Sequence, residues 1–293
     1  MIVTTTPTGN LGRQVLARLL AADTDPVRVI VRDPAKLPAG VAARAEIVVG
    51  SHGDPAVIDE ALRGADALFW LTPPPWRAER LADGMERFAR PAAEAVRNHG
   101  VGHVVGISNL GRGVPGDAGL VTHGLAVEDL FAASGAAYRP IPLPGFMDNL
   151  LASAPTLRDA GRFHSVLDGS VRVPLVASAD IVDVVTGLLL DRSWDGHEAR
   201  PVLGPEDLSM DEAAAILAEV LDRDVQYVRL SPDEFRAGLL ARGASPAMAD
   251  GMLAMMAAKN AGLDNALPRT PANSSPTTLR EWAEKVLRPA VIG

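Results

Sequence analysis

One stretch of sequence indicates the fold class more strongly than the others: Met1-Ile2-Val3-Thr4-Thr5-Thr6-Pro7-Thr8-Gly9-Asn10-Leu11-Gly12. The β-branched residues 2–5 predict a short buried strand, and Leu11, Val15 and Leu19 at helical spacing predict a helix that follows directly. A strand that passes through a glycine-containing loop into a helix is typical of the first unit of a Rossmann-type dinucleotide-binding domain.

The same alternation of β-branched runs and helical patterns continues through the first half of the chain. Further strands are predicted at residues 27–31, 46–49, 67–71, 103–107 and 137–141. Helices are predicted at 55–63, 78–98 and about 126–133, the first with Asp54 as N-cap before Pro55. Six strands joined by helices predict an α/β fold, a doubly wound parallel sheet with helices on both faces.

The pattern changes after Asn149, where helical segments dominate. We expect a Rossmann domain at residues 1–150 and a smaller, mainly helical C-terminal lobe at 151–293, some of which can return to the sheet. The expected helix starts are the capping boxes Ser209–Glu212 and Ser231–Glu234 and the serine–proline pairs at 245–246 and 275–276. A strand is predicted at residues 225–228.

Composition excludes several classes of function. The 293 residues are 47% hydrophobic and carry a net charge of −8, and no basic run is present, which argues against nucleic-acid partners. The absence of cysteine excludes disulfides and thiol catalysis. The longest apolar run is far shorter than the ~20 residues of a membrane span. We therefore expect a cytoplasmic protein without a membrane partner.

The loop after the first strand is the strongest chemical signal. Backbone amides of such a loop, together with the positive end of the following helix, receive a pyrophosphate. Gly9 allows the phosphates to approach the backbone, and Gly12 allows the helix to pack closely on the strand. The candidate cofactor contacts here are Thr6, Thr8, Gly9, Asn10, Leu11 and Gly12. The alternative is an ordinary tight turn between strand and helix.

Arg32 follows the second predicted strand, at the position that distinguishes NADP from NAD. A guanidinium can fork onto phosphate oxygens, so Arg32 favours NADP, whereas the adjacent Asp33 leaves NAD or a surface ion pair open. Ligands of doubly wound sheets lie beyond the carboxyl ends of the strands. By this topology Thr72, Pro73 and Ser108 are further cofactor candidates.

With these loops in place, the sequence resembles the NmrA-like branch of the atypical short-chain dehydrogenases/reductases, and within it the NADPH-dependent quinone oxidoreductases. The resemblance rests on residues 8–12, 31–36, 133–138, 144–150 and 275–279, in that order along almost the whole chain. It implies an NADP-binding Rossmann domain, a small C-terminal lobe, and a substrate cleft between them over the nicotinamide.

The sequence departs from the family pattern at three places. Thr6 replaces the usual first glycine, and Ser51 stands where an acidic residue usually follows the third strand. The Tyr-x-x-x-Lys pair of typical short-chain dehydrogenases is absent, because four residues after Tyr138 and Tyr227 stand a proline and a serine. The usual proton relay is therefore missing.

Without that relay, some acceptors are easier to reduce than others. Reduction of an isolated ketone gives an alkoxide that needs a positioned acid. Reduction of a quinone gives a delocalised phenolate, whose conjugate acid has a pKa of about 10, as tyrosine has. The sequence therefore favours a planar quinone-like, azo or aromatic polyketide acceptor as the small-molecule partner.

The candidate substrate contacts are Trp76, Phe146, Met147 and Asn149. Trp76 could stack on a planar ligand or plug a gap under the small lobe. Methionines at 248, 252, 255 and 256 share one face of a predicted helix, typical of core packing or of a pliable lid.

His123 is the candidate proton donor, although a single histidine is more often structural. The other histidines show no metal-ligand spacing, so no metal site is expected. Two alternatives to a quinone reductase stay open: a redox sensor that binds NADP(H) without turnover, and a tailoring enzyme of aromatic natural products. A homodimer is compatible with all three.

Overall fold

The computed structural model describes all 293 residues and contains a six-stranded sheet in the order β3-β2-β1-β4-β5-β6. Every neighbouring pair in this sheet is parallel. This is the strand order of a Rossmann domain, and it confirms the predicted fold class. The strands are β1 (Ile2–Thr4), β2 (Val27–Val31), β3 (Ala45–Val49), β4 (Ala67–Trp70), β5 (His103–Asn109) and β6 (Ala137–Leu143).

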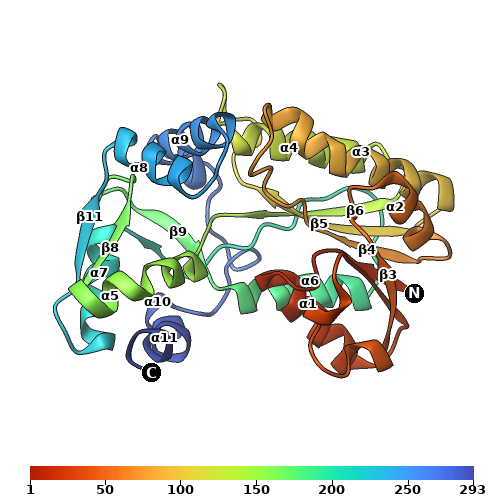
Figure 1. Ribbon diagram of the computed structural model, residues 1–293, viewed down its shortest axis with the longest axis horizontal. Coiled ribbons are helices and arrows are strands. Elements are labelled where there is room, and N and C mark those ends of the chain that lie inside the picture. Colours follow the sequence, from red (N-terminus) through yellow and green to blue (C-terminus); the bar gives the residue numbers. More distant parts are fainter.

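Helices cover both faces of the sheet (Figure 1). One face carries α2 (Pro55–Leu62), α3 (Leu81–His99) and α4 (Leu120–Ala132), and the other carries α1 (Asn10–Ala22) and α6 (Ser178–Leu190). Two short 3-10 turns, η1 (Pro34–Lys36) and η2 (Val41–Ala43), lie between β2 and β3. Helix α4 begins before the predicted residue 126, because packing overrides the weak helix propensity of its glycine and threonine residues.

The C-terminal lobe combines helices with two small sheets. One sheet pairs β10 (Asp207–Leu208), β9 (Val173–Val176) and β7 (Gly145–Phe146), and the other pairs β8 (Arg162–Ser165) with β11 (Gln226–Arg229). The α-helices are α5 (Ala154–Ala160), α7 (Met210–Leu221), α8 (Pro232–Ala241), α9 (Pro246–Asn260), α10 (Leu279–Trp282) and α11 (Arg288–Ile292). The 3-10 helices η3 (Met147–Ser153) and η4 (Leu263–Asn265) and the π-helix η5 (Ala283–Leu287) complete the lobe. The sequence pattern predicts β11 but neither β8 nor β9.

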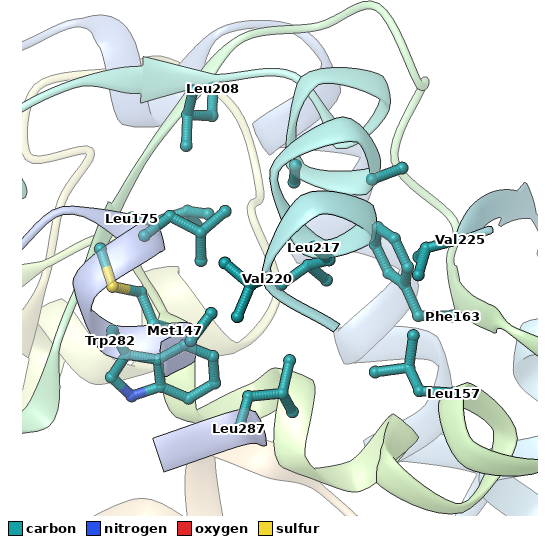
Figure 2. Packing of buried hydrophobic residues seen from close by; sticks show 14 of the residues in the cluster. Met147, Leu157, Phe163, Leu175, Leu208, Leu217, Val220, Val225, Trp282 and Leu287 are labelled. Atoms are coloured by element: carbon teal, nitrogen blue, oxygen red, sulfur yellow. The ribbon is translucent and has the colours of Figure 1, made fainter. Parts of the chain in front are cut away.

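This lobe has a hydrophobic core of its own (Figure 2). Phe163, Leu217 and Trp282 lie within it, between elements that are distant in the sequence. Helix α6 does not join that core: Ile181 and Val185 pack into the core beneath the large sheet. Part of the chain after residue 150 therefore returns to the sheet, and the division at residue 150 stays a prediction.

Local helix signals were mostly accurate. Both predicted capping boxes are present, and Ser245 caps α9 by accepting the Met248 amide at 3.1 Å. The expected start at Ser275 is wrong, because the Ser275 amide donates to the Leu203 carbonyl at 2.7 Å and holds this segment extended. Helix α10 is capped instead by Thr278.

The turn between β1 and α1 is unusually close. Thr6 adopts a left-handed conformation with φ of 51°, which glycine adopts at little cost and a β-branched residue does not. Its carbonyl oxygen accepts the Gly9 amide at 3.0 Å. A Cβ atom on Gly12 would lie 2.1 Å from the same oxygen, whereas one on Gly9 would lie 3.4 Å from it. Gly12 is thus required by the fold, and Gly9 is not.

His52, after β3, is buried between aromatic rings. Its side chain packs edge-on against Trp70 at 5.3 Å and against Phe88 at 4.9 Å between ring centroids. The residue is 9% exposed, and its Nε2 atom has no hydrogen-bond partner. Burial lowers the pKa of His52 to about 4. The ring is therefore neutral at pH 7.

We expect Gly12→Ala to lower the free energy of unfolding by about 1–3 kcal/mol, because the new methyl group must displace backbone. Gly9→Ala is the matched control, and we expect a change within about 0.5 kcal/mol. Urea unfolding of both variants measures the difference. Equal effects would show that the contact between Thr6 and Gly12 does not constrain the turn.

Protonation of His52 should destabilise the fold at low pH. The folded pKa lies below the unfolded one, so the unfolded chain binds the extra proton and stability falls as pH drops from 6.5 towards 4. The full loss is roughly 3 kcal/mol. His52→Gln should remove this component in urea unfolding between pH 7.5 and 4.5, and exposed His164→Gln should not. Parallel pH profiles for the parent and His52→Gln would refute the assignment.

Candidate functional site

A groove of about 630 Å³ crosses the carboxyl ends of β1, β2 and β4. It is lined by residues 6–9, 30–32, 50–52 and 73–78 and by Gly84, Arg87 and Phe88. Gly9 is the N-cap of α1 and has no side-chain capping bond, so the first amides of this helix are available to an anionic ligand. The groove therefore joins the predicted phosphate loop to Arg32.

Three arginines give this groove a positive charge in an acidic protein. Arg32, Arg77 and Arg87 line it, and none of them forms an ion pair. No acidic residue lines the groove. Guanidinium groups without carboxylate partners are suited to binding phosphate.

Asp33 is not among the residues of the groove. Its carboxylate caps η1 by accepting the Ala35 amide at 3.1 Å, and it lies 4.0 Å from Lys36. The Asp33 carboxylate, which kept NAD as an alternative cofactor in the sequence analysis, is thus engaged outside the groove.

A second, smaller hollow of about 190 Å³ adjoins the groove, and Pro74 and Pro75 line both. It lies at the ends of β4 and β5, beneath α4 and α9. Its polar wall is Thr72, Ser108 and Asn109, and its other lining residues are Leu71, Met85, Ile107, Leu120, Gly124, Val127 and Met255. The topology predicted this place for Thr72 and Ser108.

Buried charge lies directly behind this pocket. The Ser108 hydroxyl donates to the carboxylate of Glu128, whose side chain is 4% exposed. Arg112 pairs with the same carboxylate at 2.8 Å and with Asp129 at 2.9 Å. The ion pair keeps Glu128 negatively charged inside the protein, where an isolated carboxylate would be costly.

The predicted substrate residues differ in their placement. Trp76 lines the groove, but it also packs against α8 and α9. Its indole nitrogen donates to the Arg242 carbonyl at 3.4 Å. These contacts favour a packing role for Trp76 under the small lobe over stacking on a planar ligand. Phe146 is half-buried against the core of the sheet, and Asn149 is exposed. Met147 is 1% exposed within the C-terminal core, so packing replaces its expected substrate contact (Figure 2).

His123 lies half-buried on α4, next to Gly124 of the pocket wall, and lines neither hollow. Its role as proton donor stays a prediction. The two tyrosines are no substitutes. Burial raises the pKa of Tyr138, and the negative charge of Glu128 raises it further. Burial also raises the pKa of Tyr227 to about 12, and the hydroxyl of Tyr227 donates to the Leu167 carbonyl at 2.6 Å.

Asn10 connects the phosphate loop to the rest of the chain. Its side-chain amide donates to Asp148 at 3.0 Å and to the Ser178 hydroxyl at 3.4 Å, and the Ser178 amide donates to Asp148 at 3.1 Å. The start of α1 is thereby linked to η3 and to the start of α6. The Asn10 side chain is engaged in this network, and Leu11 is buried, which leaves their backbone as the expected cofactor contact.

Several residues of the site were not among the sequence candidates. His52, Arg77 and Arg87 line the groove, Asn109 ends β5 in the pocket wall, and Glu128 lies behind that wall. None of them belongs to a recognisable motif. Asn109 alone had a usable signal, since it directly follows Ser108 at the end of a predicted strand.

No group of three or more histidine or acidic side chains is placed to hold a metal ion. No helix combines the length and the apolar character that crossing a membrane requires.

Comparisons with known proteins agree with this geometry. A family model described as NAD(P)H-binding matches residues 7–145. The chain is 34% identical to a (4-alkanoyl-5-oxo-2,5-dihydrofuran-3-yl)methyl phosphate reductase of Streptomyces griseus, over 84% of this chain and 83% of the relative. It is 29% identical to an NAD(P)H azoreductase of Xenophilus azovorans, over 86% and 85% of the two chains.

Among solved structures, the NADPH complex of an NADPH-dependent quinone oxidoreductase of Escherichia coli matches with a TM-score of 0.78 and 25% identity, over 98% of this chain and 99% of the other. The matched region includes the phosphate loop, both hollows and the C-terminal lobe. The chain therefore belongs to the NmrA-like family of atypical short-chain dehydrogenases/reductases and is an NAD(P)H-dependent oxidoreductase.

Proposed function

We propose that this oxidoreductase uses NADPH as hydride donor and reduces planar, electron-poor acceptors of the quinone type. The observation that carries the proposal is the arrangement of the two hollows. An arginine-lined groove leads to a small pocket whose walls contain neither tyrosine nor lysine.

The groove supports NADPH over NADH. Arg32 at the end of β2, with Arg77 and Arg87 across the groove, provides positive charge where the adenosine half of a dinucleotide lies in a Rossmann domain. The capping role of Asp33 removes the carboxylate that would bind a ribose diol. A 2′-phosphate therefore fits this site better than a hydroxyl does.

The chain's own residues would bind and orient the cofactor. The amides at the start of α1 would hold the pyrophosphate, and the small pocket would receive the nicotinamide and the acceptor beside it. When bound, NADPH supplies the hydride. Pro74, Pro75 and Met255 would provide apolar walls beside the bound nicotinamide and acceptor.

The proposed class of acceptor follows from the absence of a tyrosine or lysine proton donor in the small pocket. Neither tyrosine reaches the pocket, and Lys259 is paired with Asp264. A product whose charge is delocalised, as in a reduced quinone, can leave without immediate protonation, whereas an alkoxide cannot. Positioning of the two reactants is then the main contribution of the site.

The names of the relatives support an electron-poor acceptor: an azo compound in one case, a quinone in another, and a dihydrofuranone with an alkanoyl group in a third. Aromatic polyketides with a quinone ring belong to the same chemical class. A role in tailoring natural products is thus a narrower form of the same proposal.

A redox sensor is the second candidate, because the lack of a positioned acid also suits a protein that binds NADPH without turning it over. Tight NADPH binding with no acceptor reduced in a broad panel would favour the sensor. His123→Ala decides whether a side-chain donor contributes: general acid catalysis usually amounts to about 10²–10⁴-fold in rate.

Arg32→Ala should weaken NADPH binding about 10- to 100-fold, because a charge-assisted contact to phosphate is lost, and should leave NADH binding nearly unchanged. Calorimetric titration with both cofactors measures the effect. Arg97→Ala removes an exposed arginine of α3 outside the groove and serves as the control for net charge. Equal affinity of the parent for NADPH and NADH would refute the preference.

Quinones should exceed aliphatic ketones in kcat/KM by at least about 100-fold, the contribution of one missing general acid. Anaerobic NADPH oxidation against quinones, azo dyes and ketones tests this, with NADPH deuterated on the transferred face to report hydride transfer. The purified protein should show no flavin absorption. Comparable rates with simple ketones would contradict the proposed acceptor class.

A further inference from the structure

The polar wall of the small pocket has a defined hydrogen-bond polarity. Thr72 and Ser108 both line this pocket, Thr72 two residues beyond the end of β4 and Ser108 in β5, the strand that pairs with β4. Each hydroxyl already forms one hydrogen bond to the protein, and the two bonds run in opposite directions. The two hydroxyls therefore differ in the kind of hydrogen bond that each can still form with a ligand.

Ser108 is left as an acceptor. Glu128 is ionised by its ion pair with Arg112, and an ionised carboxylate only accepts hydrogen bonds. The proton of the Ser108 hydroxyl is thus directed at Glu128, away from the pocket. Only the lone pairs of its oxygen remain for a ligand.

Thr72 is left as a donor. Its oxygen accepts the indole N–H of Trp70 at 2.8 Å, and an indole N–H only donates. The Thr72 proton has no acceptor within the protein and is free for the pocket.

We propose that this pair recognises a planar ligand in which a carbonyl oxygen stands beside an N–H or O–H donor. The carbonyl accepts from Thr72, and the neighbouring donor bonds to Ser108, whose orientation Glu128 sets. Two sources share this chemistry: an acceptor substrate with an amino or hydroxyl group next to its quinone carbonyl, and the carboxamide of the nicotinamide. The substrate arm rests on the proposed function.

Two matched ligand pairs separate the sources by calorimetry, which needs no turnover. The substrate pair is 2-amino- and 2-dimethylamino-1,4-naphthoquinone, titrated into the protein loaded with NADP⁺. The cofactor pair is NADP⁺ and its 3-acetylpyridine analogue, in which a methyl group replaces the amino group of the carboxamide. In each pair only the first ligand carries the N–H donor.

The parent should prefer the N–H ligand of one pair by about 3- to 10-fold, the value of one hydrogen bond. Ser108→Ala should abolish that preference. Glu128→Gln should reduce or reverse it, because an amide can donate to Ser108 and turn its proton into the pocket. The control is Ser134→Ala, a similarly buried serine that donates to the Phe131 carbonyl at 2.6 Å outside the pocket.

If Ser108→Ala abolishes the preference for the N–H ligand in the quinone pair, the site binds the substrate. If it abolishes the preference in the cofactor pair, the site binds the carboxamide of the nicotinamide. A parent without preference in either pair, or a preference that Ser108→Ala leaves intact, overturns the inference. Failure of the proposed function is a separate result, since it shows as NADPH binding without reduction of any quinone.

Discussion

The close approach of the Thr6 carbonyl to the Cα atom of Gly12 is the contact on which the site depends. It places the start of α1 directly beyond the end of β1, so that the free amides of the helix face the groove. Asn10, the first residue of α1, connects this end to Asp148 and Ser178. These hydrogen bonds therefore fix the phosphate loop, η3 of the C-terminal lobe and the start of α6 relative to one another.

Charge is distributed unevenly over the protein. The chain carries eight more negative than positive charges, yet three arginines without ion-pair partners line the cofactor groove, and its walls carry no carboxylate. Exposed guanidinium groups without carboxylate partners are suited to binding phosphate oxygens, which gives a physical basis for the proposed preference for a cofactor with an additional phosphate.

The chemistry of the pocket is determined by what lies behind it. Glu128 is buried, held ionised by Arg112 and bonded to Ser108, so the polar wall is arranged before any ligand arrives. Burial keeps Tyr138 protonated and out of reach. A pocket that orients ligands but supplies no strong acid suits acceptors whose reduced form is already a stable anion.

Sequence reasoning predicted the Rossmann fold, the tight turn between β1 and α1 and the placement of Arg32 directly after β2, because strand and helix periodicity and glycine spacing are local properties. It also predicted two capping boxes, whose partners are three residues apart. It left open which part of the chain after residue 150 returns to the sheet, and it did not reveal the buried Met147, the extended segment at Ser275, or the approach of Arg77, Arg87 and Glu128 to the site. Those features depend on contacts between segments far apart in the chain, which only the tertiary structure brings together.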